Sequence, residues 1–210
     1  MQQVSPPRRR GRPPKTQPSF SESRDALIRA GLVALTEKGF SATGLDQILK
    51  AAGVPKGSFY YYFDSKEAFG SELITRYGEF FAAKLARFFT DPSRSPVENL
   101  MAFVIDAEAS MARFDFSRGC LVGNLGQEIG ALPEAFRQQL GDVFLGWQHQ
   151  TAACLKAAQA AGEIGSHHDA DRLAAFFWIG WEGAVLRAKL ERSGSALRTF
   201  AGTFFSMIRT

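Results

Sequence analysis

The chain has 210 residues, of which 45% are hydrophobic, and this content supports a buried core and excludes general disorder. Its net charge of +4 is unevenly spread, because residues 1–15 hold five basic side chains and no acid, which indicates an anionic partner for the N-terminal third. With two cysteines, no apolar leader segment and no apolar run long enough to span a membrane, the sequence predicts a cytoplasmic protein.

Residues 1–20 are rich in proline and arginine and nearly free of apolar side chains, so we expect this segment to be a flexible arm. Within it, "RRRGRPPK" looks like the core of an AT-hook. Arg10, Gly11 and Arg12 would then lie in a narrow minor groove, whose negative potential attracts arginine. A solvated basic tail without groove preference is the alternative.

Residues 21–66 have the pattern of three short helices. Ser23 is the predicted N-cap of the first, whose apolar residues recur at helical spacing until Gly39. "SATGLDQILKAAG" predicts the second helix, and "PKGSFYYYF" the third. A long fourth helix is expected from Lys66 to about Phe89, capped by Asp64 or Ser65.

Residues 67–210 continue as helices, without the period-two alternation of strands. The whole chain is therefore predicted to be all-α, with a small N-terminal domain over 21–66 and a larger one over 67–210. The further helices are expected at 97–113, 124–129, 134–161, 169–191 and 196–209.

The second and third predicted helices, joined by "AAGVP", match a helix-turn-helix, whose second helix lies in the DNA major groove. On the third helix Phe59 and Phe63 fall four residues apart and are expected to face the core. The tyrosines between them are left to face outward, where phenols donate to phosphate oxygens and rings lie along sugars. Covering a hydrophobic neck is the other use of such tyrosines.

The stretch "GFSATGLDQILKAAGVPKGSFYYYFDSKEAF" strongly resembles the DNA-binding module of the TetR family of bacterial repressors. The likeness covers about residues 22–70, and the helices behind it fit the family's ligand-binding and dimerisation domain. It implies a regulator that binds a palindromic double-stranded DNA operator as a homodimer. The residues it assigns to DNA are Thr43 and Lys66 at the backbone, and Lys56, Gly57, Ser58, Tyr60, Tyr61 and Tyr62 in or beside the groove.

The last two predicted helices carry adjacent phenylalanines, and neighbours on a helix point about 100° apart. We therefore expect one face against the domain core and the other against a second subunit, as in the resembled family. The small residues Gly180, Gly183 and Ala184 would permit close helix approach. A stripe opposite them is formed by Leu197, Ala201, Phe204 and Ile208.

The segment "RGCLVGNLGQEIG" mixes glycines and polar residues between two helices, a composition typical of cavity walls. It resembles the pocket-forming segment of TetR-family regulators that answer small reactive compounds, such as those of N-ethylmaleimide reductase and of acrylate utilisation. "GALP", "FWIGWEGA" and "LRAKLE" strengthen the second likeness. The resemblance implies acrylate or a close relative as the inducer.

Acrylate is a small planar carboxylate with an electrophilic alkene, so its site needs donors beside a flat apolar wall. The candidate walls are Trp147, Trp178 and Trp181, and the candidate donors are Arg118, Asn124, Gln127 and Arg187. Cys120 is either a nucleophile for the alkene, with a pKa slightly lowered by Arg118, or a small buried hydrophobe. Cys154 is expected in the core.

Two other classes compete with a regulator. A cysteine hydrolase would need one of three histidines as its base, and "SHHDAD" either binds a metal or caps a helix. No phosphate-binding loop or nucleotide fingerprint occurs, so neither an enzyme nor a cofactor is expected. A constitutive DNA-architectural protein would leave the Trp-rich and Gly-rich C-terminal half unexplained.

Release by ligand is the predicted mechanism. A ligand in the larger domain would shift the fourth helix as a pendulum. That shift would move Gly57–Tyr62 of the two subunits out of register with the major grooves.

Overall fold

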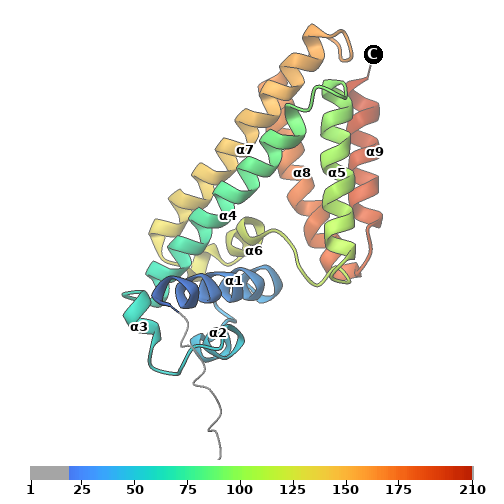
Figure 1. The fold of residues 1–210 in the computed structure, drawn as a ribbon. Coiled ribbons are helices and arrows are strands. Elements are labelled where there is room, and N and C mark those ends of the chain that lie inside the picture. The colour runs from blue at the N-terminus through green and yellow to red at the C-terminus, as the bar shows by residue number, and fades with distance from the viewer. Residues whose placement is uncertain (1–18, 210) are drawn as a thin grey trace, which may run out of the picture.

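A computed structural model describes residues 19–209, and in this range the protein is helical, with one isolated bridge between Ile164 and Arg209 as its only strand-like pairing (Figure 1). The elements are α1 (Phe20–Lys38), α2 (Leu45–Ala52), α3 (Phe59–Tyr62), α4 (Lys66–Phe89), α5 (Pro96–Ala112), α6 (Leu121–Gln127), η1 (Ile129–Ala131), α7 (Glu134–Ala160), α8 (Ala170–Glu191) and α9 (Ser195–Ile208). The all-α prediction is confirmed. None of these helices combines the length and apolarity needed to cross a membrane.

The start of α1 differs from the prediction. Ser19 is the N-cap: its hydroxyl accepts the N–H of Glu22, while the Glu22 carboxylate accepts the N–H of Ser19. This capping box satisfies two backbone donors at once, so the helix begins upstream of the expected cap, and Ser23 is buried in its first turn. Ser19 and Phe20 thus belong to α1 and its cap instead of the arm. Arg10, Gly11 and Arg12 lie outside the described residues.

Helices α1, α2 and α3 pack as a small bundle at one end of the molecule, around the N-terminus of α4 (Figure 1). Phe59 and Phe63 face its core as expected, and both rings contact Phe69 of α4, with centroids 5.4 and 4.7 Å away. Ser65 caps α4 by accepting the N–H of Ala68. Aromatic packing therefore fixes the helix-turn-helix to the first turn of the long helix.

The larger bundle is built on two long helix pairs, α4 with α7, which run parallel, and α8 with α9, which run antiparallel, with α5 alongside (Figure 1). Its centre is aromatic: the Trp147 ring lies 4.6 Å from Phe81 and 4.9 Å from Trp178 between centroids. Cys154 is buried there, as predicted. The expected bounds of its helices hold within two residues, except that α6 starts at Leu121 and stops at Gln127, before η1.

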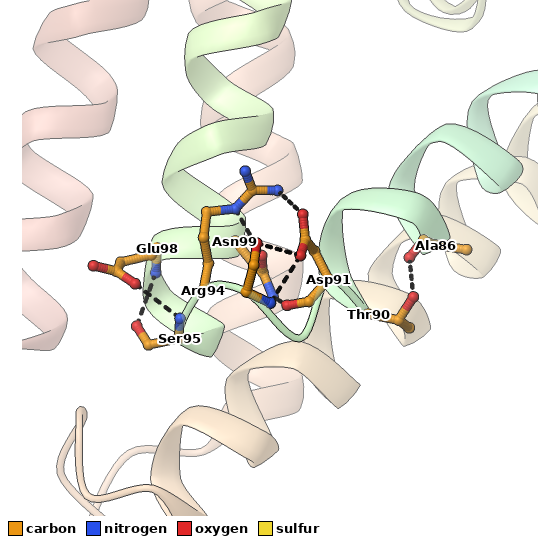
Figure 2. A network of polar contacts seen from close by, with 8 residues as sticks. Ala86, Thr90, Asp91, Arg94, Ser95, Glu98 and Asn99 are labelled. Carbon is orange, nitrogen blue, oxygen red and sulfur yellow. Dashed lines mark hydrogen bonds and ion pairs between the residues drawn. The ribbon is translucent and has the colours of Figure 1, made fainter.

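The turn between α4 and α5 is held by polar contacts (Figure 2). Arg94 donates to the Asp91 carboxylate at 2.7 Å and to the Asn99 amide oxygen at 3.1 Å. Ser95 and Glu98 form a second capping box at the start of α5. These contacts tie the turn to the first residues of α5. The domain boundary at 66/67 stays a prediction.

Candidate nucleic-acid interface and ligand cavity

The segment 56–62, which we call the recognition segment, presents an exposed surface at the free end of the small bundle. Tyr60 and Tyr61 are 68% and 75% exposed. Gly57 has φ +96°, in the left-handed region that favours glycine, and open space where a side chain would stand. Lys56 forms an exposed ion pair with Asp46 of α2 at 2.6 Å. Two phenols, an ammonium and bare backbone therefore face solvent together.

Two members of the recognition segment are less accessible than predicted. Ser58 and Tyr62 are half-buried, and the Tyr62 ring packs on Phe20, with centroids 5.0 Å apart. Phe20 was expected in the arm, and its ring instead packs on the third helix. The Tyr61 ring also lies 5.4 Å from the Phe20 ring between centroids, so both tyrosines join α3 to α1.

The two residues predicted to meet the DNA backbone hold the turn between α1 and α2. Thr43 is buried, and its hydroxyl donates to the Gly39 carbonyl at 2.6 Å. The phosphate contact predicted for Thr43 stays a prediction, and in the structure its hydroxyl is engaged with this carbonyl. Lys66 donates to the Phe40 carbonyl at 3.0 Å, and its ammonium lies 4.4 Å from the centre of the Phe40 ring.

A cavity of about 450 Å³ lies in the larger bundle, between α1, α4, α5, α8 and the segment before α6. Most of its wall is apolar. Polar side chains reach it from three helices and one loop. They are Tyr77 and Lys84 of α4, Ser110 of α5, Glu182 of α8, and Arg118 and Cys120 of the segment before α6. Such a space, mostly apolar with a few converging polar groups, is the usual form of a small-molecule site.

Three of the eight predicted ligand residues line this cavity: Arg118, Cys120 and Trp181. The Arg118 guanidinium is already engaged, since it donates to Glu37 at 2.9 Å and lies 3.9 Å from the Phe114 ring centre. Trp181 supplies a flat wall, as expected.

The other five predicted ligand residues do not line it. Trp147 and Trp178 are buried in the core, where Trp178 donates to the Thr151 hydroxyl at 2.9 Å. Arg187 is exposed on α8 and pairs with Glu191, and Gln127 is exposed on α6. These two tryptophans therefore pack in the hydrophobic core. Arg187 lies on the outward face of α8.

Asn124, the fifth, joins the two bundles. Its amide donates to the carbonyls of Leu35 and Thr36 at the end of α1, at 2.9 and 2.8 Å. Lys189 of α8 donates to the same Thr36 carbonyl at 3.1 Å. Glu128, directly after α6, accepts the N–H groups of Phe40 and Ser41. We call Asn124, Glu128 and Lys189 the clamp.

Glu128 and Lys189 of the clamp were not among the predicted site residues, and neither were Tyr77 and Glu182 of the cavity. Glu182 had a sequence signal, because it directly follows the apolar run Leu173–Trp181 on a predicted helix. A carboxyl in such a place is rarely without a function.

Burial dominates the acid–base character of the cavity. It raises the pKa of the Cys120 thiol well above its ordinary value, and the nearby Glu182 carboxyl adds to that rise. The expectation that Arg118 lowers this pKa is therefore wrong. Burial also raises the pKa of Tyr77, and it raises that of Glu182 to about 7, a rise partly offset by a hydrogen bond from Cys120.

Near the other end of α8, Asp169 is the helix N-cap and accepts the N–H groups of Asp171 and Arg172. His167 and His168 stack on each other in the preceding loop, with ring centroids 4.1 Å apart. Of the two uses considered for "SHHDAD", the structure thus gives helix capping.

A helix-turn-helix with an exposed recognition segment, clamped to a helical bundle that encloses a cavity, defines a DNA-binding regulator. Family models agree with this class: residues 27–73 match the bacterial regulatory proteins of the tetR family, and residues 96–204 match the tetracyclin repressor-like C-terminal domain. The chain belongs to the TetR family of transcriptional repressors. It stands with these regulators and not with the enzymes considered above.

Similarity to individual family members extends over most of the chain. It is 55% identical over 196 residues to the transcriptional regulator AcuR of Cereibacter sphaeroides, covering 93% of this chain and 89% of AcuR. It is 32% identical to the repressor DhaR of Mycobacterium sp., with 88% and 91% covered, and 26% identical to the repressor NemR of Escherichia coli, with 90% and 95% covered.

Among solved structures, a regulatory protein TetR from Rhodobacter sphaeroides superposes with a TM-score of 0.87 at 54% identity, covering 89% of this chain and 98% of that one. The reduced form of E. coli NemR gives 0.79 at 27% identity, with 90% and 98% covered.

Proposed function

We propose that the protein is a repressor that binds a palindromic operator as a homodimer and is released by acrylate or a closely related small carboxylate. The observation that carries the proposal is the clamp, which ties the wall of the ligand cavity to the turn before the DNA-binding helices. The inducer is inferred from the segments that resemble acrylate-utilisation regulators and from the similarity to AcuR. Acting on DNA, it would work in the cytoplasm.

On the DNA side, the proposed groove contacts are made by Lys56, Gly57, Tyr60 and Tyr61, which are all exposed. Tyr62 and Ser58 would contribute from the edge of this surface, and Lys66 from the start of α4. Phenol and ammonium donors on one convex surface suit phosphates and sugar edges. Arg10 and Arg12 of the arm would add a contact in the adjacent minor groove.

The proposed dimer forms through α8 and α9. On α8 the residues Phe176, Ile179, Gly183, Leu186 and Leu190 are exposed and follow one another at spacings of three and four. Such a stripe of exposed apolar side chains on one helix is typical of a helix-packing interface. The stripe Leu197, Ala201, Phe204 and Ile208 of α9 is buried within the subunit instead, so the outer face of α9 consists of other residues.

Signal transfer would start at Cys120, which lines the cavity and is also the N-cap of α6, where its sulfur accepts the Gly123 N–H. A ligand that shifts Cys120 therefore shifts α6. Asn124 and Glu128 on and after α6 would carry this shift to the end of α1 and to the turn before α2. The predicted pendulum motion of α4 acts in parallel, since α4 also lines the cavity.

A binding titration on DNA from upstream of the protein's own gene tests the proposal. We expect tight, salt-sensitive binding that millimolar acrylate releases and that propionate, its saturated analogue, does not. Specific binding that acrylate leaves intact would reject acrylate as the inducer but keep the repressor. A complete lack of specific binding would reject the operator assignment.

A further inference from the structure

We propose that Glu182 recognises the inducer's carboxylate as a neutral carboxylic acid, so that each carboxylate bound in the cavity brings in one proton. The inference rests on the proposed function, because it concerns the ligand of the same cavity. It names a specificity residue and a ligand class: small monocarboxylates, whose affinity falls as the pH rises, in contrast to their uncharged amides.

The position of Glu182 is built into the fold. Its carboxyl packs against the Gly123 backbone at the N-terminus of α6, so closely that a Cβ at Gly123 would lie 2.0 Å from Oε2. Cys120 and Tyr77 lie beside it, on the same side of the cavity. Glu182 is the only acidic residue among the described residues that line the cavity.

Neither cation that lines the cavity pairs with this carboxyl. The two basic residues that line the cavity are engaged elsewhere: Lys84 pairs with Asp106 of α5, and Arg118 pairs with Glu37 of α1. An ionised Glu182 would thus stand unpaired in a mostly apolar space, and a second carboxylate beside it would be repelled. Protonation removes both penalties and turns a repelling group into a hydrogen-bond donor.

Two neighbours of Glu182 in the cavity do not titrate near neutrality. Cys120 and Tyr77 keep their protons, because burial raises the pKa of each well above its ordinary value. Lys189, about two turns further along α8, shares a small neighbouring space with Glu182; burial lowers the pKa of its ammonium group, which donates to the Thr36 carbonyl. The pKa of Glu182, about 7, is therefore the one in the cavity that falls near neutrality.

The consequence is a linkage between ligand and proton. If only the protonated form accepts the carboxylate, affinity is constant well below the pKa and falls about tenfold per pH unit above it. Between about pH 6 and about pH 9 an aliphatic carboxylate ligand stays ionised, so the change comes from the protein. Acrylamide, which has the same shape and no charge, needs no proton and should bind with a flat profile.

Calorimetric titration of the full chain with acrylate and with acrylamide between about pH 6 and about pH 9 tests the inference. We expect acrylate affinity to fall about fiftyfold or more across this range, while acrylamide affinity changes less than about threefold. Repeating the acrylate titration at pH 8 in Tris and in phosphate, which differ in ionisation enthalpy, should give an uptake near one proton per site.

Glu182→Gln isolates the side chain, because a carboxamide donates a hydrogen bond at every pH. This variant should bind acrylate with a flat profile and exceed the unmodified protein at about pH 9. Glu134→Gln, which removes an exposed carboxyl of α7, should keep the steep profile. Operator binding without ligand, measured over the same range, controls for pH effects on DNA contacts.

Acrylate binding with a flat profile and no proton uptake would overturn the inference and leave the proposed inducer standing. Affinity that rises with pH would overturn it as well. An absence of acrylate binding at every pH, in a protein that still binds its operator, would reject both the inducer and the inference. The wild-type titrations decide these outcomes even if Glu182→Gln does not fold.

Discussion

Glu128 accepts the backbone N–H of Ser41 at 2.8 Å, so a side chain from the ligand-binding bundle is hydrogen-bonded to the turn that leads into the helix-turn-helix. The same carboxylate accepts the N–H of Phe40 at 3.2 Å. Gly39 makes this approach possible: its φ is +82°, and a Cβ there would lie 1.6 Å from Glu128 Oε1. Position 39 therefore has two independent reasons to be glycine.

Glu128→Ala should weaken the coupling between ligand and operator. The change leaves two backbone N–H groups of the α1–α2 turn without their carboxylate, which costs about 2 kcal/mol for a charge-assisted pair. We expect the inducer to change operator affinity several-fold less than in the unmodified protein, because the turn no longer follows α6. Operator titrations with and without inducer measure this ratio. Glu134→Ala, an exposed carboxyl on α7, is the control, and an unchanged ratio in Glu128→Ala would exclude the clamp from signal transfer.

Tyr60→Ala should lower operator affinity about tenfold, the effect expected for one lost polar contact and its ring surface. Ligand affinity should not change, because Tyr60 is 68% exposed on the recognition segment, away from the cavity. Tyr60→Phe separates the hydroxyl from the ring. Fluorescence anisotropy on operator DNA and calorimetry with ligand measure the two affinities. A variant that binds operator normally but ignores the ligand would refute the assignment of this surface.

Ile179→Glu should dissociate the dimer. Ile179 is 74% exposed in the centre of the α8 stripe, and a carboxylate there would be buried without a partner against the second subunit. A cost of about 3 kcal/mol corresponds to about a hundredfold in the dimer Kd. Sedimentation velocity over a range of protein concentrations measures the fraction of dimer. Ile105→Glu, at a 65% exposed isoleucine on α5, is the matched control and should remain dimeric. Loss of the dimer in both variants would point to a different interface.

Glu182→Gln should raise stability at and above neutral pH. The folded pKa of Glu182, about 7, exceeds its ordinary value of 4.5, so folding favours the protonated form. Its contribution is fully present below about pH 4.5 and is lost as the pH rises through about 7, a change of about 3 kcal/mol at most. Thermal unfolding between pH 5 and pH 8 should thus show a smaller decline in Tm for Glu182→Gln. Parallel curves for the two proteins would mean that Glu182 is not a buried acid.

Cys120 should not form an adduct with acrylate at neutral pH. Burial and the Glu182 carboxyl raise the pKa of its thiol, and addition to an alkene requires the thiolate. Intact mass spectrometry after incubation with inducer should find an unchanged mass, and Cys120→Ser should still be released from operator. A mass increase equal to one acrylate on the unmodified protein, absent from Cys120→Ser, would establish the covalent alternative.

The fold could be predicted from the sequence because it depends on local sequence signals. Helical spacing of apolar residues, Gly39 as a stop, and Ser65 as one of two candidate caps all predicted elements that the structure contains. The inward positions of Phe59 and Phe63 followed from their separation by four residues. The start predicted at Ser23 was misplaced because a capping box lay a few residues upstream, and the start of α6 was expected at 124 instead of Leu121.

Only part of the candidate site could be predicted from the sequence. A motif search picks out polar residues and tryptophans, but tertiary packing decides which of them meet. Trp147 and Trp178 were predicted as walls of the ligand cavity, but they lie in the core, because burying large apolar side chains is favourable. Arg118 and Lys84 are cations whose charges are already paired, and those partners, Glu37 and Asp106, come from distant parts of the chain.

The sequence by itself therefore determined the helices, the helix-turn-helix and the outward position of Tyr60 and Tyr61, because these depend on the periodicity of single segments. Only the tertiary structure decided the cavity, the clamp and the character of Glu182. Each of these depends on contacts between residues far apart in the chain, as between Glu128 and Ser41. The acidity of a carboxyl depends on burial and on the charges around it, and both exist only after the bundle has closed.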